Sequence, residues 1–195
     1  LRVDAGDIGM HLAASRCEAV SDGLLACGGG VRLDVSMPRE NLRQVLNPAT
    51  AMVKDDALAY RGPLPADARP EPHTIVISDV NGDGHEDLLL WSGLEGAYGG
   101  PSFDVYLFDR QARELRHSQA FSDLTVGYTG LFGVNGTRIT TDARSGCCTR
   151  IHETWSVRND EPELVERITS GGEPGDATSV RERLVDGEMR RVDTD

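Results

Sequence analysis

Positive charge is scarce in this sequence, and its scarcity excludes one broad class of function. Twenty Lys and Arg residues stand against 32 Asp and Glu residues, so the formal net charge is −12 at pH 7. No block of five or more basic residues occurs anywhere in the chain. A nucleic-acid-binding protein needs a cationic surface to displace the counterions of phosphate groups. We therefore exclude nucleic acid as a partner.

Long apolar runs and catalytic motifs are also missing. The longest stretch of strongly apolar side chains, Leu88 to Trp91, is far too short to span a membrane. The spacings of nucleophile elbows, zinc-protease helices, phosphate loops and dinucleotide loops do not occur in the sequence. The five histidines lie apart and have no motif beside them. We therefore predict that the protein is not an enzyme.

The four cysteines follow neither a CxxC pattern nor a zinc-ligand spacing, which favours disulfides and an oxidising compartment. Four cysteines allow three pairings. We favour Cys17 with Cys27, which closes a short Gly-rich loop, over bridges to Cys147 and Cys148. Reduced, buried thiols in a cytoplasmic protein are the alternative. The chain begins at Leu1 with no apolar leader before it, and we interpret it as a mature or trimmed form whose targeting segment is missing.

Helical periodicity never extends beyond two turns, whereas short alternating or β-branched runs recur between clusters of Gly, Asp, Asn and Pro. The chain is therefore predicted to be mostly strand, although Arg39–Val45 fits a helical turn as well as a strand. The predicted strands are 31–37, 42–46, 74–78, 88–91, 103–108, 115–121, 138–141, 152–157, 164–169, 180–185 and 188–192.

Four stretches share a strand, polar turn and strand plan, and Asp186-Gly187 is a favoured two-residue hairpin turn. Repeated hairpins predict an all-β fold, with the antiparallel hairpins in a β-propeller-like arrangement. A sandwich of meanders, or unrelated hairpins in a generic β domain, remain open. We expect a single domain over 1–195, with residues 1–30 as an N-terminal extension that carries two cysteines. Residues 62–72, with four prolines, are expected to be a connector.

Residues 79–87 read Asp-Val-Asn-Gly-Asp-Gly-His-Glu-Asp, which is the pattern of a calcium-binding loop. Side-chain oxygens stand at loop positions 1, 3, 5 and 9, and Gly84 at position 6 permits a sharp turn. Position 12 is Leu90 rather than Glu, and both flanks look like strands, so we predict a strand-loop-strand site instead of an EF-hand. A solvated acidic turn is the alternative. The predicted Ca²⁺ ligands are Asp79, Asn81, Asp83, the His85 carbonyl and Asp87.

The Gly-rich segment 92–102 follows the predicted calcium loop after one strand and is the predicted partner-binding loop. An aromatic side chain on a loop that is held at its base enters a cleft with little loss of entropy, and Tyr is common at interface hot spots. A flexible surface loop with Tyr98 folded onto the body is the alternative. The predicted contact residues are Tyr98, Glu95, Gly99 and Gly100.

The Asp79–Asp87 loop resembles the aspartate-rich calcium turns of FG-GAP propeller repeats. A longer resemblance rests on that loop together with Gly93–Ser102, Phe103–Asp109, Arg144–Cys148 and Trp155-Ser-Val. Over roughly residues 31–170 the chain resembles a family of bacterial periplasmic immunity lipoproteins. Members of that family inhibit a lysozyme-like peptidoglycan hydrolase that a type IV secretion system delivers to competing bacteria. The resemblance implies a β-propeller-like fold, bound calcium and inhibition of a muramidase.

We therefore expect a calcium-binding inhibitor of a lysozyme-like peptidoglycan hydrolase that acts as an immunity protein. The resemblance places it in the periplasm, as an outer-membrane lipoprotein in the full-length precursor. Contact with the membrane would be made only through a lipid anchor that this chain does not include. The competing function is a calcium-dependent carbohydrate-binding or adhesion module, since other proteins with such aspartate-rich turns have that role.

Overall fold

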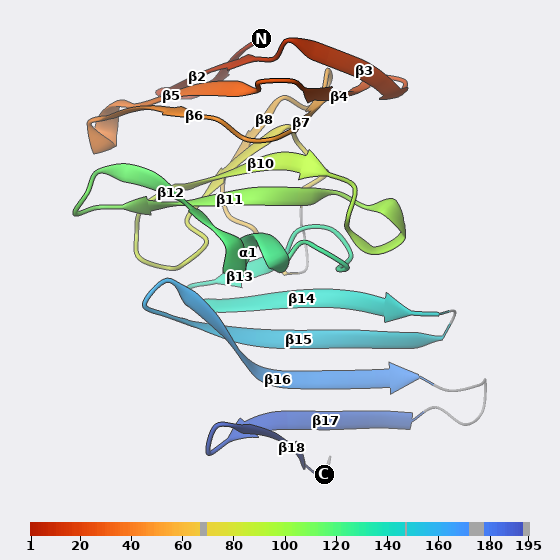
Figure 1. Cartoon of the computed structure of the whole chain (residues 1–195). Helices are drawn as coiled ribbons and strands as arrows, with labels where there is room; N and C mark the ends of the chain where they lie inside the picture. The colour runs from red at the N-terminus through yellow and green to blue at the C-terminus, as the bar shows by residue number, and fades with distance from the viewer. Residues whose placement is uncertain (67–69, 147, 172–177, 193–195) are drawn as a thin grey trace.

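The computed structural model describes residues 1–66, 70–146, 148–171 and 178–192, and these residues form an almost all-β molecule (Figure 1). Strands make up 59% of the chain and helices 6%, which confirms the all-β class. In the described ranges, helix is limited to α1 (Gln119–Asp123) and two 3-10 turns, η1 (Pro38–Glu40) and η2 (Ala97–Gly99). None of these helices is long and apolar enough to cross a membrane.

The described strands form four sheets, which we name by their place in the chain. The N-terminal sheet has the order β1 (Arg2–Ala5), β2 (Ile8–Ala13), β5 (Arg32–Met37), β6 (Leu42–Leu46). The hairpin sheet has the order β3 (Arg16–Ser21), β4 (Leu24–Gly28), β7 (Ala51–Lys54). The central sheet has the order β12 (Glu114–Ser118), β11 (Ser102–Asp109), β10 (Asp87–Gly93), β9 (Ile75–Ser78), β8 (Ala59–Arg61). The C-terminal sheet runs in chain order through β13 (Gly133–Asn135), β14 (Arg138–Ser145), β15 (Thr149–Arg158), β16 (Glu161–Gly171), β17 (Thr178–Val185) and β18 (Glu188–Val192).

The chain progresses from one end of the molecule to the other, so that the N-terminus and the C-terminus lie at opposite ends (Figure 1). The N-terminal sheet lies at the top of this view, the central sheet in the middle and the C-terminal sheet at the bottom. Antiparallel hairpins dominate as predicted, but the described sheets do not close into a propeller or barrel. Closure would bring the first and last strands together, and here they lie far apart.

The central sheet is buried on both faces, and this explains its unbroken apolar runs. Ile75 and Ile77 point into one core cluster with the N-terminal sheet, whereas Val76 points into a second cluster with α1 and the C-terminal sheet. Leu88 and Leu89 divide between the two clusters in the same way. Because side chains alternate between the faces of a strand, a strand that is covered on both sides is apolar at every position.

Two expectations about the chain are corrected by the structure, and one is confirmed. Residues 1–30 are not an extension, because they supply four strands to two sheets that also contain later strands. The predicted strand 42–46 is confirmed as β6, and the 3-10 turn η1 precedes it. The strand predicted over 115–121 ends at Ser118, whose side chain caps α1 by accepting a hydrogen bond from the Phe121 amide at 3.4 Å. The described part of the Pro-rich segment 62–72 contains neither helix nor strand.

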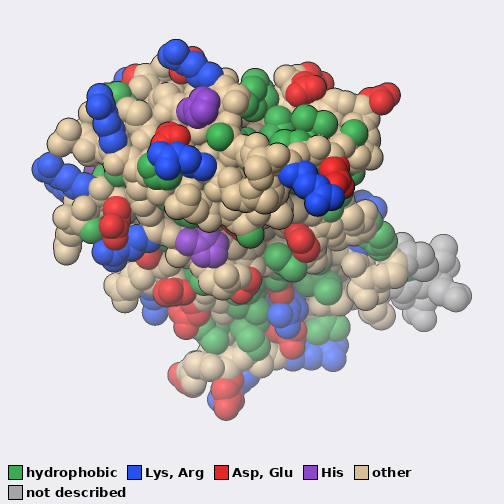
Figure 2. Space-filling view, turned by 45° about the horizontal axis from the view of Figure 1, so that its top comes forward, with side chains coloured by type: hydrophobic (Ala, Val, Ile, Leu, Met, Phe, Trp, Pro, Cys, Tyr) green, Lys and Arg blue, Asp and Glu red, His purple; other side chains and the backbone are tan. Residues whose placement is uncertain are grey.

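Charges of both signs are interspersed over the face that comes forward in Figure 2. Lysine and arginine side chains (blue) alternate there with acidic side chains (red) instead of gathering into a basic patch. On the outer face of the N-terminal sheet, for example, Arg32 pairs with Asp34 at 2.6 Å and Arg2 pairs with Asp4 at 3.0 Å. This face therefore offers no cationic surface of the kind that binds nucleic acid.

Candidate functional site

The predicted calcium loop connects β9 to β10 in the central sheet, which gives it the predicted strand-loop-strand setting. The Asp79 carboxylate holds the loop closed, because its two oxygens accept hydrogen bonds from the amides of Gly82 (2.8 Å) and Gly84 (2.9 Å). Gly82 and Gly84 have φ values of 77° and 88°, a region in which residues with a side chain are strained. The two glycines therefore allow the backbone to curl around Asp79.

The side chains at loop positions 3 and 5 make short-range contacts of the same kind. The Asn81 oxygen accepts a hydrogen bond from the Asp83 amide at 3.2 Å, and an Asp83 oxygen accepts one from the His85 amide at 2.8 Å. Asn81 is buried, and its amide nitrogen donates to the carboxylate of Asp160 at 2.7 Å. The loop is therefore joined to the turn between β15 and β16 of the C-terminal sheet.

Asp87, at loop position 9, is fully buried and makes two hydrogen bonds to the backbone. Its oxygens accept from the amides of Val80 (2.9 Å) and Phe108 (2.8 Å), so it joins both ends of the loop to β11. Burial raises the pKa of this carboxyl to about 8, the two amides oppose that rise, and the negative charges of Asp83 and Asp79 add to it.

The residues of the loop fit calcium in their chemistry but are engaged with the backbone in this structure. Each predicted side-chain ligand offers at least one oxygen atom, which is the donor type that Ca²⁺ prefers. In the described part of the chain, however, no three His, Cys, Asp or Glu side chains are gathered closely enough to hold a metal ion. Calcium binding by Asp79, Asn81, Asp83, the His85 carbonyl and Asp87 therefore stays a prediction.

The loop also lies where three sheets meet. A Cβ on Gly82 would come within 2.8 Å of the backbone of Gly136 and Thr137 in the β13–β14 turn, so this contact requires glycine. On the other side, Glu86 receives two hydrogen bonds of 2.6 Å from Arg61, which also binds Asp7 at 2.6 Å. These two carboxylates raise the pKa of the Arg61 guanidinium, with the larger effect from Glu86. The loop thus connects the N-terminal, central and C-terminal sheets.

The predicted partner-binding loop connects β10 to β11 and presents Tyr98 at its tip. Tyr98 is 75% exposed and has a φ of 57°, so the backbone turns sharply at this residue. Its hydroxyl donates to the carbonyl of Gly146, in the β14–β15 connection, at 3.0 Å. Gly99 has a φ of 76° and open space around its Cα, and Gly100 closes the turn by donating to the Ala97 carbonyl at 3.1 Å.

Glu95 is exposed near the base of this loop, and neighbouring residues hold both its side chain and its backbone. Its carboxylate accepts a hydrogen bond from the hydroxyl of Ser102. Its backbone carbonyl accepts from the amide of Gly127 at 2.8 Å, and the amide of Ala97 donates to the carbonyl of Tyr128 at 2.7 Å. The four predicted contact residues therefore lie together on a loop that is braced by neighbouring segments rather than free to move.

Sequence reasoning missed the residues that brace this loop. The Tyr128 hydroxyl donates to Glu153 at 2.7 Å, and Arg167 donates to the other oxygen of that carboxylate at 2.6 Å. Glu153 is 3% exposed. Burial, followed by the hydrogen bond to Glu153, raises the pKa of Tyr128. The sequence contains a signal for this position. Glu153 stands two residues from both Ile151 and Trp155, so it shares the apolar, inward-facing side of the strand with them.

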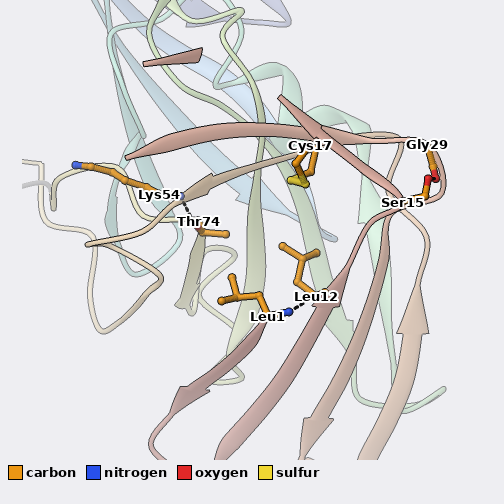
Figure 3. Close-up of a disulfide and its surroundings, with 8 residues drawn as sticks. Leu1, Leu12, Ser15, Cys17, Gly29, Lys54 and Thr74 are labelled. Atoms are coloured by element: carbon orange, nitrogen blue, oxygen red, sulfur yellow. Dashed lines mark hydrogen bonds between the residues drawn. A yellow bond between two sulfur atoms is a disulfide. The ribbon is translucent and has the colours of Figure 1, made fainter. Parts of the chain in front are cut away.

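The favoured cysteine pairing is present in the structure. Cys17 and Cys27 face each other across β3 and β4 and are joined by a disulfide with an S–S distance of 2.02 Å (Figure 3). Cys147 lies outside the described residues, so the structure does not describe how it pairs. A disulfide in the hairpin sheet is the feature expected of a protein from an oxidising compartment.

One serine-histidine contact within the described chain has the wrong geometry for catalysis. The Ser122 hydroxyl lies 3.2 Å from His117 Nε2, but it donates its proton to the Ser118 carbonyl at 2.7 Å. It also accepts from the Val105 amide at 2.9 Å, and Ser122 is 5% exposed. A nucleophile must be reachable and must give its proton to the base. Ser122 therefore has a structural role at the base of α1.

Comparison with known proteins places the chain beside a secretion-related protein. No family model matches the sequence, and no curated protein matches it. A solved structure described as a Xanthomonas type IV secretion system related protein is 37% identical, with a TM-score of 0.95. The alignment covers 100% of this chain and 93% of that chain. Identity of this extent over the whole length shows that the chain belongs to the same family as this Xanthomonas type IV secretion system related protein.

Proposed function

We propose that this protein inhibits a lysozyme-like peptidoglycan hydrolase and thereby acts as an immunity protein against a secreted antibacterial effector. Two findings support the proposal from different directions. The chain shares its family with a type IV secretion system related protein, and its motifs resemble those of periplasmic immunity lipoproteins. A protein that protects against a secreted hydrolase must present a surface that enters or covers the cleft of that enzyme.

The observation that carries the proposal is the presentation of Tyr98. A side chain of this size that is 75% exposed gains nothing from burial in the protein itself. The hydroxyl bond to Gly146 nevertheless fixes the direction of the ring, so little side-chain entropy remains to be lost on binding. Exposed, rigid tyrosines of this kind are typical anchors at interface hot spots. The adjoining glycines allow the backbone of an enzyme cleft to approach closely.

Charge supports the same class of partner. Peptidoglycan hydrolases of the lysozyme type commonly carry cationic surfaces, and a protein with a net charge of −12 is steered toward such surfaces. Glu95 lies three residues before Tyr98 and is exposed, so it is the acidic group nearest in sequence to the proposed anchor. In this proposal Tyr98 supplies affinity, and Glu95 accelerates association.

We further propose that Ca²⁺ binds the Asp79–Asp87 loop and has a structural role. When bound, the ion would supply an inner positive charge that neutralises the three aspartates of the loop. The loop already connects three sheets through Asp160, Gly136 and Arg61. Asp79 and Asp83 organise the backbone around the site, and Asp87 joins it to β11. Metal binding here would therefore stabilise the fold as a whole rather than act as a signal.

The disulfide supports an extracytoplasmic location, since structural disulfides persist in oxidising compartments such as the bacterial periplasm. We propose that the protein acts in the periplasm, as an outer-membrane lipoprotein in its full-length precursor. We also propose that it has no hydrolytic activity of its own. The Ser122 arrangement supports this view, because its hydroxyl proton is committed to the backbone.

A lysis assay tests the proposed function directly. A purified lysozyme-like peptidoglycan hydrolase of the parent organism is added to a peptidoglycan suspension, with and without an equimolar amount of the protein, and turbidity is followed. We expect clearing with the hydrolase alone and suppressed clearing with the protein added. Equal clearing in the two samples would contradict the proposal and favour a calcium-dependent carbohydrate-binding or adhesion module. Binding of the protein to the peptidoglycan suspension would then test that alternative function.

A further inference from the structure

Seven large apolar side chains are exposed among the residues that the structure describes, and three of them lie on two adjacent loops. Leu94 is 39% exposed and Tyr98 is 75% exposed, both on the β10–β11 loop. Val126, which is 49% exposed, lies on the segment 124–130 that follows α1. In Figure 1 these two loops lie on the same side of the molecule as the C-terminal end of β14. Scattered apolar residues need no explanation, but a cluster of them marks an interaction surface.

Two backbone hydrogen bonds hold these loops side by side. The Gly127 amide donates to the Glu95 carbonyl at 2.8 Å, and the Ala97 amide donates to the Tyr128 carbonyl at 2.7 Å. Val126 is therefore adjacent to a residue that contacts the first loop directly. The loops cannot separate without breaking both bonds, so they present their side chains as one unit.

The start of the second loop is fixed to the strand that follows the first. Thr125 is fully buried, and its hydroxyl oxygen accepts from the Phe103 amide at 2.9 Å. Leu124, which precedes it, is buried in the second core cluster. Because β11 begins at Ser102, the bases of the two loops are attached to the same end of one strand.

The far end of the second loop is fixed by the buried carboxylate of Glu153. Tyr128 donates its hydroxyl to one Glu153 oxygen at 2.7 Å, and Arg167 donates to the other at 2.6 Å. Thr141 also donates to Glu153 at 3.4 Å, so the same carboxylate oxygen joins the loop to β14. The chain of contacts thus runs from β15 through Tyr128 to the Ala97 amide, directly beside Tyr98. An exposed valine between two anchored ends keeps an apolar side chain in solvent, which is unfavourable unless a partner covers it.

We propose that Leu94, Tyr98 and Val126 form one two-loop contact surface for the cleft of the lysozyme-like hydrolase, and that Tyr128 and Glu153 are positioning residues for it. This inference rests on the proposed function and extends it to a second loop that the sequence does not single out. The occupant is the cleft of that hydrolase, because the exposed side chains lie on two loops that two backbone hydrogen bonds hold together, so they can enter a concave surface as one unit. Val126 supplies a second apolar contact beside the Tyr98 anchor.

The test compares inhibition by Val126→Asp with inhibition by Val20→Asp, using the same lysozyme-like hydrolase as the lysis assay. Val20 is a matched control, because it is 47% exposed and lies on β3 in the hairpin sheet. We expect Val126→Asp to weaken inhibition about tenfold and Val20→Asp to inhibit like the wild type. If Val126→Asp also inhibits like the wild type while Tyr98→Ala does not, the second loop is not part of the surface and the proposed function stands. If the wild type does not inhibit, the proposed function and this inference fail together.

A second pair of variants tests the positioning role of Tyr128. Tyr128→Phe and Tyr60→Phe each remove one hydroxyl hydrogen bond of 2.7 Å, but Tyr60 lies on β8 and donates to the Pro63 carbonyl, away from the two loops. Inhibition is measured well below both melting temperatures, so that a loss of stability alone has no effect. We expect Tyr128→Phe to weaken inhibition about threefold to fivefold and Tyr60→Phe to inhibit like the wild type. Equal inhibition by the two variants would overturn the positioning role.

Discussion

The side-chain amide of Gln44 forms two hydrogen bonds with the backbone of Leu115, although 71 residues separate them. Its nitrogen donates to the Leu115 carbonyl at 2.9 Å, and its oxygen accepts from the Leu115 amide at 2.7 Å. Leu115 lies on β12, the edge strand of the central sheet, and Gln44 lies on β6, the edge strand of the N-terminal sheet. The side chain of Gln44 therefore pairs with the backbone amide and carbonyl of an edge strand, as a neighbouring strand would.

Replacing Gln44 by Ala should lower the free energy of unfolding by about 1–3 kcal/mol. The substitution leaves the amide and carbonyl of the buried Leu115 without their partner, and unsatisfied buried polar groups are more costly than the net value of the bonds. Urea unfolding measures the change. Gln111→Ala is the control, since its side chain is exposed, and it should be neutral. Equal midpoints for the two variants would show that water replaces Gln44 at this edge.

The Gln44 contact also shows what the sequence could and could not predict. Gln44 lies between Leu42 and Leu46 on the inward face of its strand, so the sequence marks it as a polar group that needs a buried partner. No local pattern identifies Leu115 as that partner, because the contact depends on how two sheets meet. The same holds for Asn81 and Asp160, whose contact joins the predicted loop to a distant turn.

Local chemistry was predicted better than long-range arrangement. The strand Glu188–Val192 and the loop between β9 and β10 follow from turn residues and apolar runs, and both lie where the sequence indicates. The strand Arg16–Ser21 was missed because all six of its residues are exposed and show no alternation. The ring of a propeller was expected from repeated hairpins, but hairpins pair locally whether or not the sheets close.

Removing the Cys17–Cys27 disulfide should loosen the hairpin sheet before the rest of the molecule. A bridge with a sequence separation of 10 stabilises by about 3 kcal/mol when the loop-closure relation is applied. Because β3 buries no residue, little else holds it. The double variant Cys17→Ala/Cys27→Ala avoids a reductant, which would act on every disulfide. Hydrogen exchange should show loss of amide protection on β3 with β10 unchanged.

The matched control for this prediction is Ser21→Ala, an exposed change on the same strand that leaves the bridge intact. It should retain the wild-type exchange pattern. Protection of β3 that survives in the double alanine variant would mean that strand pairing with β4 is sufficient to hold the hairpin without the disulfide.

Asp104→Asn should raise the stability at neutral pH and have no effect in acid. Burial raises the pKa of Asp104, Glu95 adds to the rise, and Ser92 and His117 oppose it. A carboxyl whose pKa is raised on folding contributes fully to stability below its unfolded pKa of about 3.9, and this contribution is lost as the pH rises through the folded value. The neutral amide of the variant does not titrate, so at neutral pH the variant keeps the stability that the wild type loses.

The measurement is the melting temperature of both proteins at pH 7 and at about pH 3, where the wild-type carboxyl is protonated in both states. The difference should favour the variant at pH 7 and vanish in acid. Asp22→Asn, at an exposed position, should show no such difference. A lower melting temperature for Asp104→Asn at pH 7 would show that the ionised carboxylate is held by Ser92 more strongly than burial disfavours it.

Calcium should raise the melting temperature, and EDTA should lower it. A loop with three carboxylates and no Glu at position 12 is expected to bind with a Kd of about 10⁻⁴ to 10⁻³ M. Binding to the native state alone stabilises by about 2.7 kcal/mol when the free ion is a hundredfold above Kd. Asp83→Ala should abolish the response, whereas Asp22→Ala should preserve it. A melting curve that is the same in calcium and in EDTA would refute the metal site.

Tyr98→Ala should weaken inhibition of the hydrolase by tenfold or more without changing the melting temperature. Truncation of a central aromatic anchor typically costs at least about 2 kcal/mol of binding free energy, whereas this side chain is too exposed to support the fold.

Tyr98→Phe separates the two roles of the residue, because it keeps the ring and removes the hydroxyl bond to Gly146. It should fall between the wild type and Tyr98→Ala. Glu95→Ala should weaken inhibition modestly and mainly at low salt, where steering by charge is strongest. If Tyr98→Ala inhibits as well as the wild type, the inhibitory surface lies elsewhere, since no other change in the loop removes as much exposed contact area.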